Sequence, residues 1–473
     1  MRREILVPLI VATALFMENV DSSVIATSLP EISRDLGVDP IALKLALTSY
    51  LLSLAVFIPI SGWMADKFGA RTVFRAAIAV FTLSSIACGF AQGLPDLVLY
   101  RIVQGIGGAM MVPVGRLVIL RMIPKHELVS ALAWLAVPAL IGPMIGPPLG
   151  GFITTYFHWR WIFWINIPIG ILGFVLVTKY IDNIREDKVP PLDVVGFILS
   201  GIGLTGLAFG FTTVGQELLP LWLSAGMIVV GAITIYFYVR HARVHPAPLI
   251  DLKLFSVQTF RASVIGGSLF RVGVGAMPFL LPLMFQLGFG LSPLQSGLLT
   301  FAGAAGAILM RFTVAPILRR FGIKRVLVVN TFVAASFVAA AGLFTPATPY
   351  LIIIAVLLVG GFFRSLQFST LNSLAFADLG TSTMSQATSL TSVAQQISVS
   401  AGVAVAAIVL ESLRYARGGH EILLSDFSIG FFAVAACSAA SIFVLVRLPI
   451  DAGTALIAPP PPEADSTERG PQA

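Results

Sequence analysis

Residues 141–151 read Ile-Gly-Pro-Met-Ile-Gly-Pro-Pro-Leu-Gly-Gly and lie within an apolar stretch. A helix inside a bilayer normally avoids this much glycine and proline, because proline lacks a backbone donor and clashes with the preceding turn. Such residues are tolerated there where a neighbouring helix packs closely or satisfies the backbone again. The run therefore predicts a tightly packed membrane helix, and a kinked packing helix is its simplest interpretation. Its pattern residues are Gly142, Gly146, Pro147, Gly150 and Gly151.

Apolar residues dominate the whole chain. Hydrophobic residues make up 57% of the 473 positions and charged residues only 11%, whereas a soluble domain carries roughly a quarter charged residues. Apolar runs of about 20 residues, the length needed to cross a bilayer, recur from end to end. The first begins near Ile5 without a following cleavage site, so we expect a retained span rather than a signal peptide. The composition predicts an all-α membrane protein embedded in the lipid bilayer.

The basic residues between the apolar runs indicate how the chain is threaded. Of the 30 Lys and Arg residues, 21 fall on the side of the two termini and five on the opposite side. This positive-inside pattern predicts that both termini are cytoplasmic, and it attributes the net charge of +7 to topology rather than to nucleic-acid binding. The proline-rich residues 451–473 predict a disordered tail. We expect fourteen spans, centred near Ala14, Val56, Val80, Gly108, Ile141, Ile171, Gly203, Gly231, Val274, Ala305, Ala335, Val359, Gly402 and Val434.

Two loops repeat one pattern. Residues 62–71, Gly-Trp-Met-Ala-Asp-Lys-Phe-Gly-Ala-Arg, follow the second span, and residues 315–325, Ala-Pro-Ile-Leu-Arg-Arg-Phe-Gly-Ile-Lys-Arg, follow the tenth. If spans seven and eight are an inserted hairpin, two six-helix halves remain, as in transporters built from parallel repeats. The predicted boundaries are 1–188 for the first bundle, 189–245 for the hairpin and 246–450 for the second bundle. A duplicated scaffold without transport is the alternative.

Five motifs together resemble the major facilitator superfamily, and within it the branch of fourteen-helix drug:proton antiporters. Residues 62–71 resemble the signature loop of the superfamily, and residues 141–151 resemble the antiporter motif on the fifth helix. Residues 100–108, Tyr-Arg-Ile-Val-Gln-Gly-Ile-Gly-Gly, resemble the fourth-helix motif with its buried arginine. Residues 21–30, Asp-Ser-Ser-Val-Ile-Ala-Thr-Ser-Leu-Pro, resemble the first-helix motif, and residues 159–170 resemble the start of helix six.

This resemblance covers roughly residues 5–450 and implies a fold and an activity. The fold is the major facilitator fold, with two six-helix bundles and the inserted hairpin. The activity is proton-coupled export of small molecules across the bacterial inner membrane by alternating access, by a monomer, with the proton gradient as the energy source. The chain departs from the pattern at Ala26, where the branch often has Asn, and at Arg319, where the second loop lacks the acid of the first.

The first loop is a candidate cytoplasmic gate, formed by Gly62, Asp66, Gly69 and Arg71. Gly62 would let its helix approach a neighbour closely, and a facing helix N-terminus or Arg71 could hold the Asp66 carboxylate. A charge cluster across the two halves would then close the cytoplasmic side. The alternative is that the basic residues of the loop only set topology.

Two acids lie inside a span away from its ends, Glu18 and Asp21, and their i, i+3 spacing places them on one face of the first helix. Charges within a membrane are costly and need partners. Two close carboxylates in a low dielectric favour holding a proton between them, which suits a proton carrier. Arg101 is the expected counter-ion. The alternatives are that Glu18 reaches the interface and that Arg101 forms a static salt bridge.

The second half carries arginines without matching acids. Arg271, Arg311 and Arg364 lie in its spans, and Gln367 and Gln395 add hydrogen-bonding capacity. Guanidinium groups around a cavity would repel a lipophilic cation and bind carboxylate or phosphate. The charges thus favour organic anions or metal chelates as substrates. The resemblance alone implies a broad multidrug exporter of lipophilic cations.

Other classes of function find little support in the chain. It has no Walker sequence for ATP and no glycine-rich dinucleotide loop after a strand, so we expect neither an enzyme nor a bound cofactor. His241 and His245 are four residues apart but lack any third ligand nearby, so we expect no metal site. Cys88 and Cys437 lie in apolar runs of different halves and are expected to be core residues. A non-transporting membrane sensor or scaffold is the remaining alternative.

Overall fold

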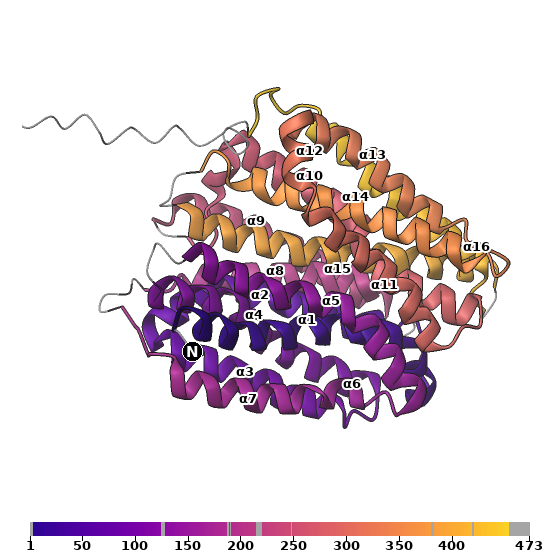
Figure 1. Ribbon diagram of the computed structural model, residues 1–473, viewed down its shortest axis with the longest axis horizontal. Helices are drawn as coiled ribbons and strands as arrows, with labels where there is room; N and C mark the ends of the chain where they lie inside the picture. The colour runs from indigo at the N-terminus through magenta and orange to yellow at the C-terminus, as the bar shows by residue number, and fades with distance from the viewer. Residues whose placement is uncertain are drawn as a thin grey trace, which may run out of the picture.

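The computed structural model describes residues 3–123, 128–186, 189, 191–213, 220–246, 248–379, 383–418 and 421–453, and all regular secondary structure in these ranges is helical. Long helices lie roughly side by side, with the N-terminal helices grouped at the bottom of Figure 1 and the C-terminal helices at the top. The predicted all-α architecture is confirmed. The predicted disordered tail falls from residue 454 onward outside the described residues.

Seven helices form the N-terminal group. Within it, α1 packs on α5 and α7, while α4 lies between α2 and α3. The helices are α1 (Arg3–Leu36), α2 (Lys44–Phe68), α3 (Ala70–Cys88), α4 (Leu94–Met122), α5 (Leu128–Tyr156), α6 (Trp161–Trp164) and α7 (Asn166–Tyr180).

The C-terminal group begins after a helical hairpin. In this group, α10 packs on α14, α15 and α16, and α11 packs on α14. The hairpin is α8 (Val194–Thr213) and α9 (Leu221–Val244). The C-terminal elements are η2 (Leu252–Ser256), α10 (Gln258–Leu283), the π-helical turn η3 (Met284–Gly288), α11 (Pro293–Arg311), α12 (Val314–Phe321), α13 (Ile323–Ala341), α14 (Tyr350–Phe376), α15 (Met384–Ala416), α16 (Leu424–Ala440) and α17 (Ile442–Leu445).

Every predicted span centre falls within a helix. Thirteen helical segments of the described residues are long and apolar enough to cross a membrane, with α6 and α7 counted together as Trp161–Tyr180. The helix of the remaining centre, Ile141, is α5, and its side chains before Ile141 lie outside the described residues. Large apolar side chains such as Ile171, Ile198 and Ile233 are about half exposed. Surfaces of this kind belong in contact with lipid.

The two predicted loop repeats adopt the same backbone turn. Gly69 joins α2 to α3 with φ of 92°, and Gly322 joins α12 to α13 with φ of 76°. Residues with a Cβ avoid this left-handed region, so glycine is required at both turns. The surroundings differ, because the Asn183 side chain covers Gly69, whereas a Cβ on Gly322 would meet nothing within 4 Å.

The two groups meet along a seam in which α5 packs on α11 and α2 packs on α15. The hairpin lies beside this seam, since α8 contacts both α2 and α15. We call the side where α1 begins the terminal face and the side where α1 ends the opposite face; they lie at the left and right of Figure 1.

Contacts at the opposite face join the two groups. Lys44 Nζ lies 3.1 Å from Glu411 Oε2, Asp39 pairs with Arg414, and Gln286 donates to the Thr27 carbonyl at 2.7 Å. The basic residues that the sequence assigns to this side each form an ion pair with an acid. The pairs are Arg34–Glu31, Lys44–Glu411, Arg160–Asp35, Arg414–Asp39 and Arg417–Asp426.

Candidate functional site

A cavity of about 500 Å³ lies between the two groups, near the middle of the helices. Helices α1, α2, α4 and α5 line it from one side, and α10, α11, α14 and α15 from the other. Its charged lining residues are Arg101, Arg311 and Arg364, and no acid belongs to the described lining. A pocket with fixed positive charges and mainly apolar walls suits a small ligand that carries negative charge.

Arg364 and Arg311 face this cavity from the C-terminal group. Among the described residues, none forms a hydrogen bond or an ion pair with Arg364, which lies midway along α14. Arg311 ends α11 at the terminal face and is exposed. A guanidinium has five donors, and those of Arg364 are available to a ligand in the cavity.

Arg101 is held in a network around Asp21. Its Nη1 lies 2.5 Å from Asp21 Oδ2 and 2.7 Å from Gln104 Oε1, while its Nε donates to the Ala46 carbonyl at 3.3 Å. The guanidinium carbon lies 4.2 Å from the centre of the Tyr50 ring. Both charged side chains of the ion pair are only 1% exposed. This is a desolvated pair whose donors and acceptors come from several helices.

Amides complete the coordination of Asp21. Gln104 Nε2 and Asn166 Nδ2 donate to Asp21 Oδ1 at 2.9 Å and 2.8 Å, and Asn166 also donates to Ser85 Oγ at 2.9 Å. Asp21 therefore accepts from α4 and α7 at once. Sequence reasoning assigned no role to Gln104 or Asn166, although an amide one turn after Arg101 in an apolar helix is a usable signal.

Glu18 has a different environment from Asp21. Its side chain is buried, and Oε2 has no hydrogen-bond partner among the described residues. Within those residues no hydrogen bond joins Glu18 to Asp21. The two acids of α1 are thus unequal, because Asp21 is saturated by donors and Glu18 is not. The ring of Tyr50 packs against Arg101, and its buried hydroxyl also has no hydrogen-bond partner in the described ranges.

Arg271 lies behind the cavity rather than in its described lining. Its Nη2 donates to Asn372 Oδ1 at 2.9 Å, and its guanidinium carbon lies 5.1 Å from the centre of the Phe368 ring. Its Nε and Nη1 have no hydrogen-bond partner within the described part of the chain. Gln395 approaches the same Asn372 oxygen at 3.5 Å. The polar residue that organises this cluster is Asn372, which sequence reasoning did not select.

Gln367 is also remote from the cavity. It accepts from Asn330 at 2.9 Å and donates to Thr331 Oγ1 at 2.7 Å and to the Leu327 carbonyl at 3.2 Å. All of these partners lie on α13. Its hydrogen-bonding groups are therefore occupied in joining α14 to α13, and Gln367 does not line the cavity as the sequence predicted.

The glycines of residues 141–151 bring α5 against two helices. A Cβ on Gly146 would lie 1.9 Å from Ser23 Oγ, and one on Gly150 would lie 2.4 Å from the Val24 carbonyl oxygen, both on α1. Gly142 approaches Asn19 in the same way. Gly151 instead faces the Pro293 carbonyl of α11 at 2.4 Å. The run thus packs one face on its own group and another across the seam, and α5 is one continuous helix despite its prolines.

Pro147 contributes its backbone to the same packing. Its carbonyl accepts from Thr27 Oγ1 at 3.4 Å, and a Cβ on Gly297 of α11 would lie 2.3 Å from the same oxygen. Such approaches exclude side chains at the glycine positions.

Comparison with known proteins decides the family. A sequence profile described as the Major Facilitator Superfamily matches residues 11–403. The chain belongs to the Major Facilitator Superfamily. It is 38% identical over 409 residues to MdtD, a candidate multidrug resistance protein of Salmonella typhimurium, and the match covers 85% of each chain.

Solved structures of this superfamily share the fold at low identity. A transporter of the POT family bound to a thioalcohol-conjugated peptide superposes with a TM-score of 0.69 at 14% identity, covering 93% of this chain and 95% of its own. A D-xylose–proton symporter superposes with a TM-score of 0.67 at 15% identity, covering 95% and 98%. The protein is a multi-pass membrane transporter of small molecules and not an enzyme.

In the signature loop of this Major Facilitator Superfamily member, residues 62–71, Asp66 has a different ion-pair partner from the one we expected. Asp66 Oδ1 accepts from Arg121 at 2.6 Å, and Arg121 also donates to Glu186 at 2.9 Å. The holder of Asp66 is thus Arg121 of α4 rather than Arg71. A Cβ on Gly62 would meet nothing within 4 Å, so the expected close approach there is wrong for this conformation. The ion pairs between the halves, Lys44–Glu411 and Asp39–Arg414, lie at the opposite face, whereas Gly62 lies in the part of α2 nearer the terminal face.

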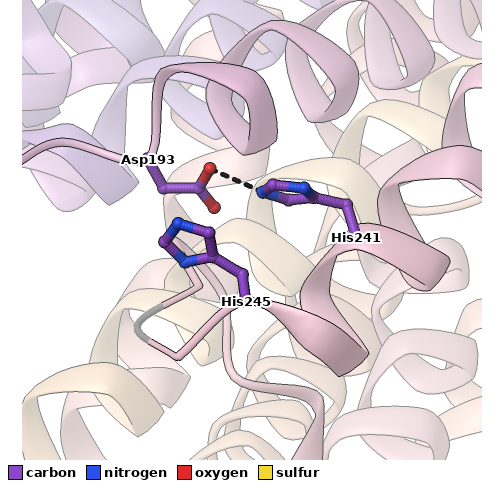
Figure 2. Close-up of side chains that lie close together, drawn as sticks. All are labelled: Asp193, His241 and His245. Carbon is purple, nitrogen blue, oxygen red and sulfur yellow. Dashed lines mark hydrogen bonds and ion pairs between the residues drawn. The ribbon is translucent and has the colours of Figure 1, made fainter.

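The expectation that His241 and His245 lack a third ligand is wrong. Asp193 lies 48 residues before His241, and its Oδ1 is 2.7 Å from His241 Nε2 (Figure 2). Burial raises the pKa of Asp193, but hydrogen bonds from Gly196, His241 and Leu249 outweigh this, and the pKa lies below its usual value. The hairpin fold brings together residues that no local spacing links. Cys88 is buried, as expected, and both cysteines are free.

Proposed function

We propose that this transporter exports small organic anions or their metal chelates in exchange for protons, and that it works by alternating access. The observation that carries the proposal is the cavity between the halves, whose charged lining residues are all arginines. A desolvated cation requires an anion, and the described protein residues supply none to Arg364. The substrate would be that anion. Export, rather than uptake, is suggested by the name of the relative MdtD.

Glu18 is the best candidate for the carried proton. Its Oε2 has no hydrogen-bond partner among the described residues, so a proton could bind there without breaking an existing contact, whereas Asp21 is committed to Arg101. Binding or release of a proton at Glu18 would change the electrostatic potential at Arg101, which lines the cavity. Proton and substrate would be coupled through this arginine. The proton gradient would be the energy source, with no ATP and no other cofactor, and the transporter would work as a monomer.

The contact pattern supports a specific state of the cycle. With both termini in the cytoplasm, as the basic residues favour, the terminal face is cytoplasmic and the opposite face is periplasmic in the inner membrane. The halves are then joined on the periplasmic side by Lys44–Glu411 and Asp39–Arg414. The exposed Arg311 marks the cytoplasmic end of the cavity. This is an inward-facing state ready to receive substrate.

Transport by inverted vesicles tests the proposal. With an acidic lumen, vesicles containing the protein should accumulate a tricarboxylate, and an uncoupler should abolish the accumulation. Glu18→Gln should retain exchange of substrate for substrate but lose uphill accumulation. Accumulation of tetraphenylphosphonium with no response to carboxylates would instead establish a multidrug exporter of lipophilic cations. Binding without any exchange would indicate a sensor or scaffold.

A further inference from the structure

We propose that Asp193, His241 and His245 form a binding site for a divalent transition-metal ion, such as Zn²⁺, at the terminal-face end of the hairpin. The ion would be a resident structural ion and not cargo, because the three residues lie outside the lining of the central cavity. The inference goes beyond the proposed transport activity and does not depend on it.

The three side chains converge from two helices (Figure 2). His241 and His245 are one turn apart at the end of α9, with ring centres 5.0 Å apart, and Asp193 directly precedes α8. One ligand atom from each residue lies within 4.8 Å of the other two. Ligands around tetrahedral Zn²⁺, at about 2.0–2.2 Å from the ion, are about 3.3 Å apart, so small side-chain rotations would close the site.

The carboxylate is already positioned by backbone donors. Asp193 Oδ1 accepts from the Gly196 N–H at 2.8 Å, and Oδ2 accepts from the Leu249 N–H at 3.2 Å. The side chain is 3% exposed, so it has little freedom to leave. A carboxylate has about four lone-pair sites, so these bonds leave acceptor capacity for a metal. Outer hydrogen bonds of this kind orient ligands and strengthen metal binding.

A helix cap with an ion pair explains only part of the cluster. Asp193 caps α8 through Gly196, and a histidine near the end of α9 interacts well with a carboxylate and with the helix dipole. That arrangement needs one imidazole. It does not require a second, His245, within ligand distance of the same carboxylate. Two imidazoles and a carboxylate on a fixed frame are a ligand set for a metal.

The ligand types select the class of ion. Imidazole suits Zn²⁺, Cu²⁺, Ni²⁺ and Co²⁺, whereas Mg²⁺ and Ca²⁺ prefer oxygen ligands alone. Three protein ligands leave a fourth position for water. His241 and His245 are partly exposed, which provides a path for the ion.

A bound ion would fasten the hairpin to the start of the C-terminal group. Asp193 contacts Leu249, and the neighbouring Ile250 is bonded to Tyr238 of α9 through both its N–H at 3.0 Å and its carbonyl at 3.2 Å. The segment then continues into η2 and α10. Since α8 also contacts α2 and α15, the ion would stabilise the hairpin against the seam.

Metal titration of the purified full-length protein, freed of any polyhistidine tag, tests this proposal. We expect one Zn²⁺ per chain, a rise in thermal stability on binding, and no competition from excess Mg²⁺. His245→Ala and His241→Ala should each weaken Zn²⁺ binding by about tenfold or more. His158→Ala is the matched control, because His158 also lies beside an acid, Asp35, but at the opposite face. It should bind Zn²⁺ as the wild type does.

Spectroscopy provides a readout that a purely structural role would not change. With Cu²⁺ as the probe, electron paramagnetic resonance should show nitrogen couplings from two imidazoles in the wild type and from one in His245→Ala. Asp193→Asn would lose the oxygen that accepts from the Leu249 N–H, so a change in binding there could reflect a local structural change. His245 follows the last residue of α9, so His245→Ala is the more decisive variant. Absence of saturable Zn²⁺ binding, or unchanged binding in both histidine variants, would overturn the proposal.

Discussion

The central arginine of the N-terminal half and those of the C-terminal half have opposite environments. Arg101 is satisfied by an acid, an amide, a backbone carbonyl and an aromatic ring. Among the described residues, Arg271 has one amide partner and two nitrogens without a partner, and Arg364 has no hydrogen-bonding partner. The N-terminal half thus neutralises its central arginine internally, whereas the C-terminal half leaves the charge of Arg364 available to the cavity.

The two signature loops, residues 62–71 and 315–325, also differ in how their charged side chains are paired. Both turn at a glycine with positive φ, so the duplicated backbone is retained. Only the first is covered by Asn183 and holds its acid in an ion pair with Arg121. In the second loop the matching acid is replaced by Arg319. Duplication thus preserved the turn, and the charges diverged.

The largest effect is expected when Arg101 of the N-terminal half loses its counter-ion, Asp21. Asp21→Asn leaves Arg101 buried without a counter-ion, which should cost about 3–5 kcal/mol of stability and abolish gradient-driven export. Thermal unfolding in detergent and vesicle transport measure the two effects. The double variant Asp21→Asn with Arg101→Gln should regain stability but not transport. If Asp21→Asn alone transports uphill at the wild-type rate, the contrast between the halves has no functional meaning.

The next effect concerns the packing of α5 on α1 within the N-terminal half. Gly146→Val places a side chain where a Cβ already lies 1.9 Å from Ser23 Oγ, so transport should fall by about tenfold or more, with a smaller loss of folded yield. Gly226→Val is the control, because a Cβ there meets nothing within 4 Å. Equal activity of the two valine variants would reduce residues 141–151 to a tolerated packing pattern.

The third prediction distinguishes Arg364 from Arg271 by their contributions to substrate binding. Arg364→Gln should weaken tricarboxylate binding by about 30-fold, which corresponds to about 2 kcal/mol. Arg271→Gln should have a smaller effect, since Arg271 lies outside the described cavity lining. Exposed Arg319→Gln serves as the charge control. Binding isotherms measure the tricarboxylate affinity of all three variants. A larger loss of affinity in Arg271→Gln than in Arg364→Gln would show that the ligand binds nearer Arg271 than the described lining indicates.

The smallest effect is expected at the loop. Asp66→Asn breaks a partly exposed ion pair with Arg121, so it should slow transport by up to about fivefold and leave yield nearly normal. Initial rates in vesicles measure the change. Arg319→Ala, in the second loop, should have no effect on the rate. An unchanged rate for Asp66→Asn would exclude a gating role for the first loop.

Much of the fold could be predicted from the sequence, and less of the site. The fourteen apolar runs predicted the helices because the period and length of such runs are local properties. Asp21 and Arg101 were predictable as partners because a charge within the membrane needs one. Gln367 was misplaced, since two faces of α14 carry polar residues and only packing against α13 shows which face is occupied. Arg121 was overlooked as the partner of Asp66 because it lies 55 residues away.

Local patterns in the sequence were enough to predict the class of protein, the positions of the apolar spans and the presence of a repeat, because bilayer energetics act on each segment separately. The sequence also predicted that Arg271, Arg311 and Arg364 lie within the spans of the second half with no acid at comparable depth, which requires only counting. Tertiary structure alone decided which arginines reach the cavity, why Asp21 is saturated and Glu18 is not, and how Asp193 meets two histidines. These features depend on the directions of side chains from helices distant in the chain, and such directions are set by helix packing rather than by any local pattern.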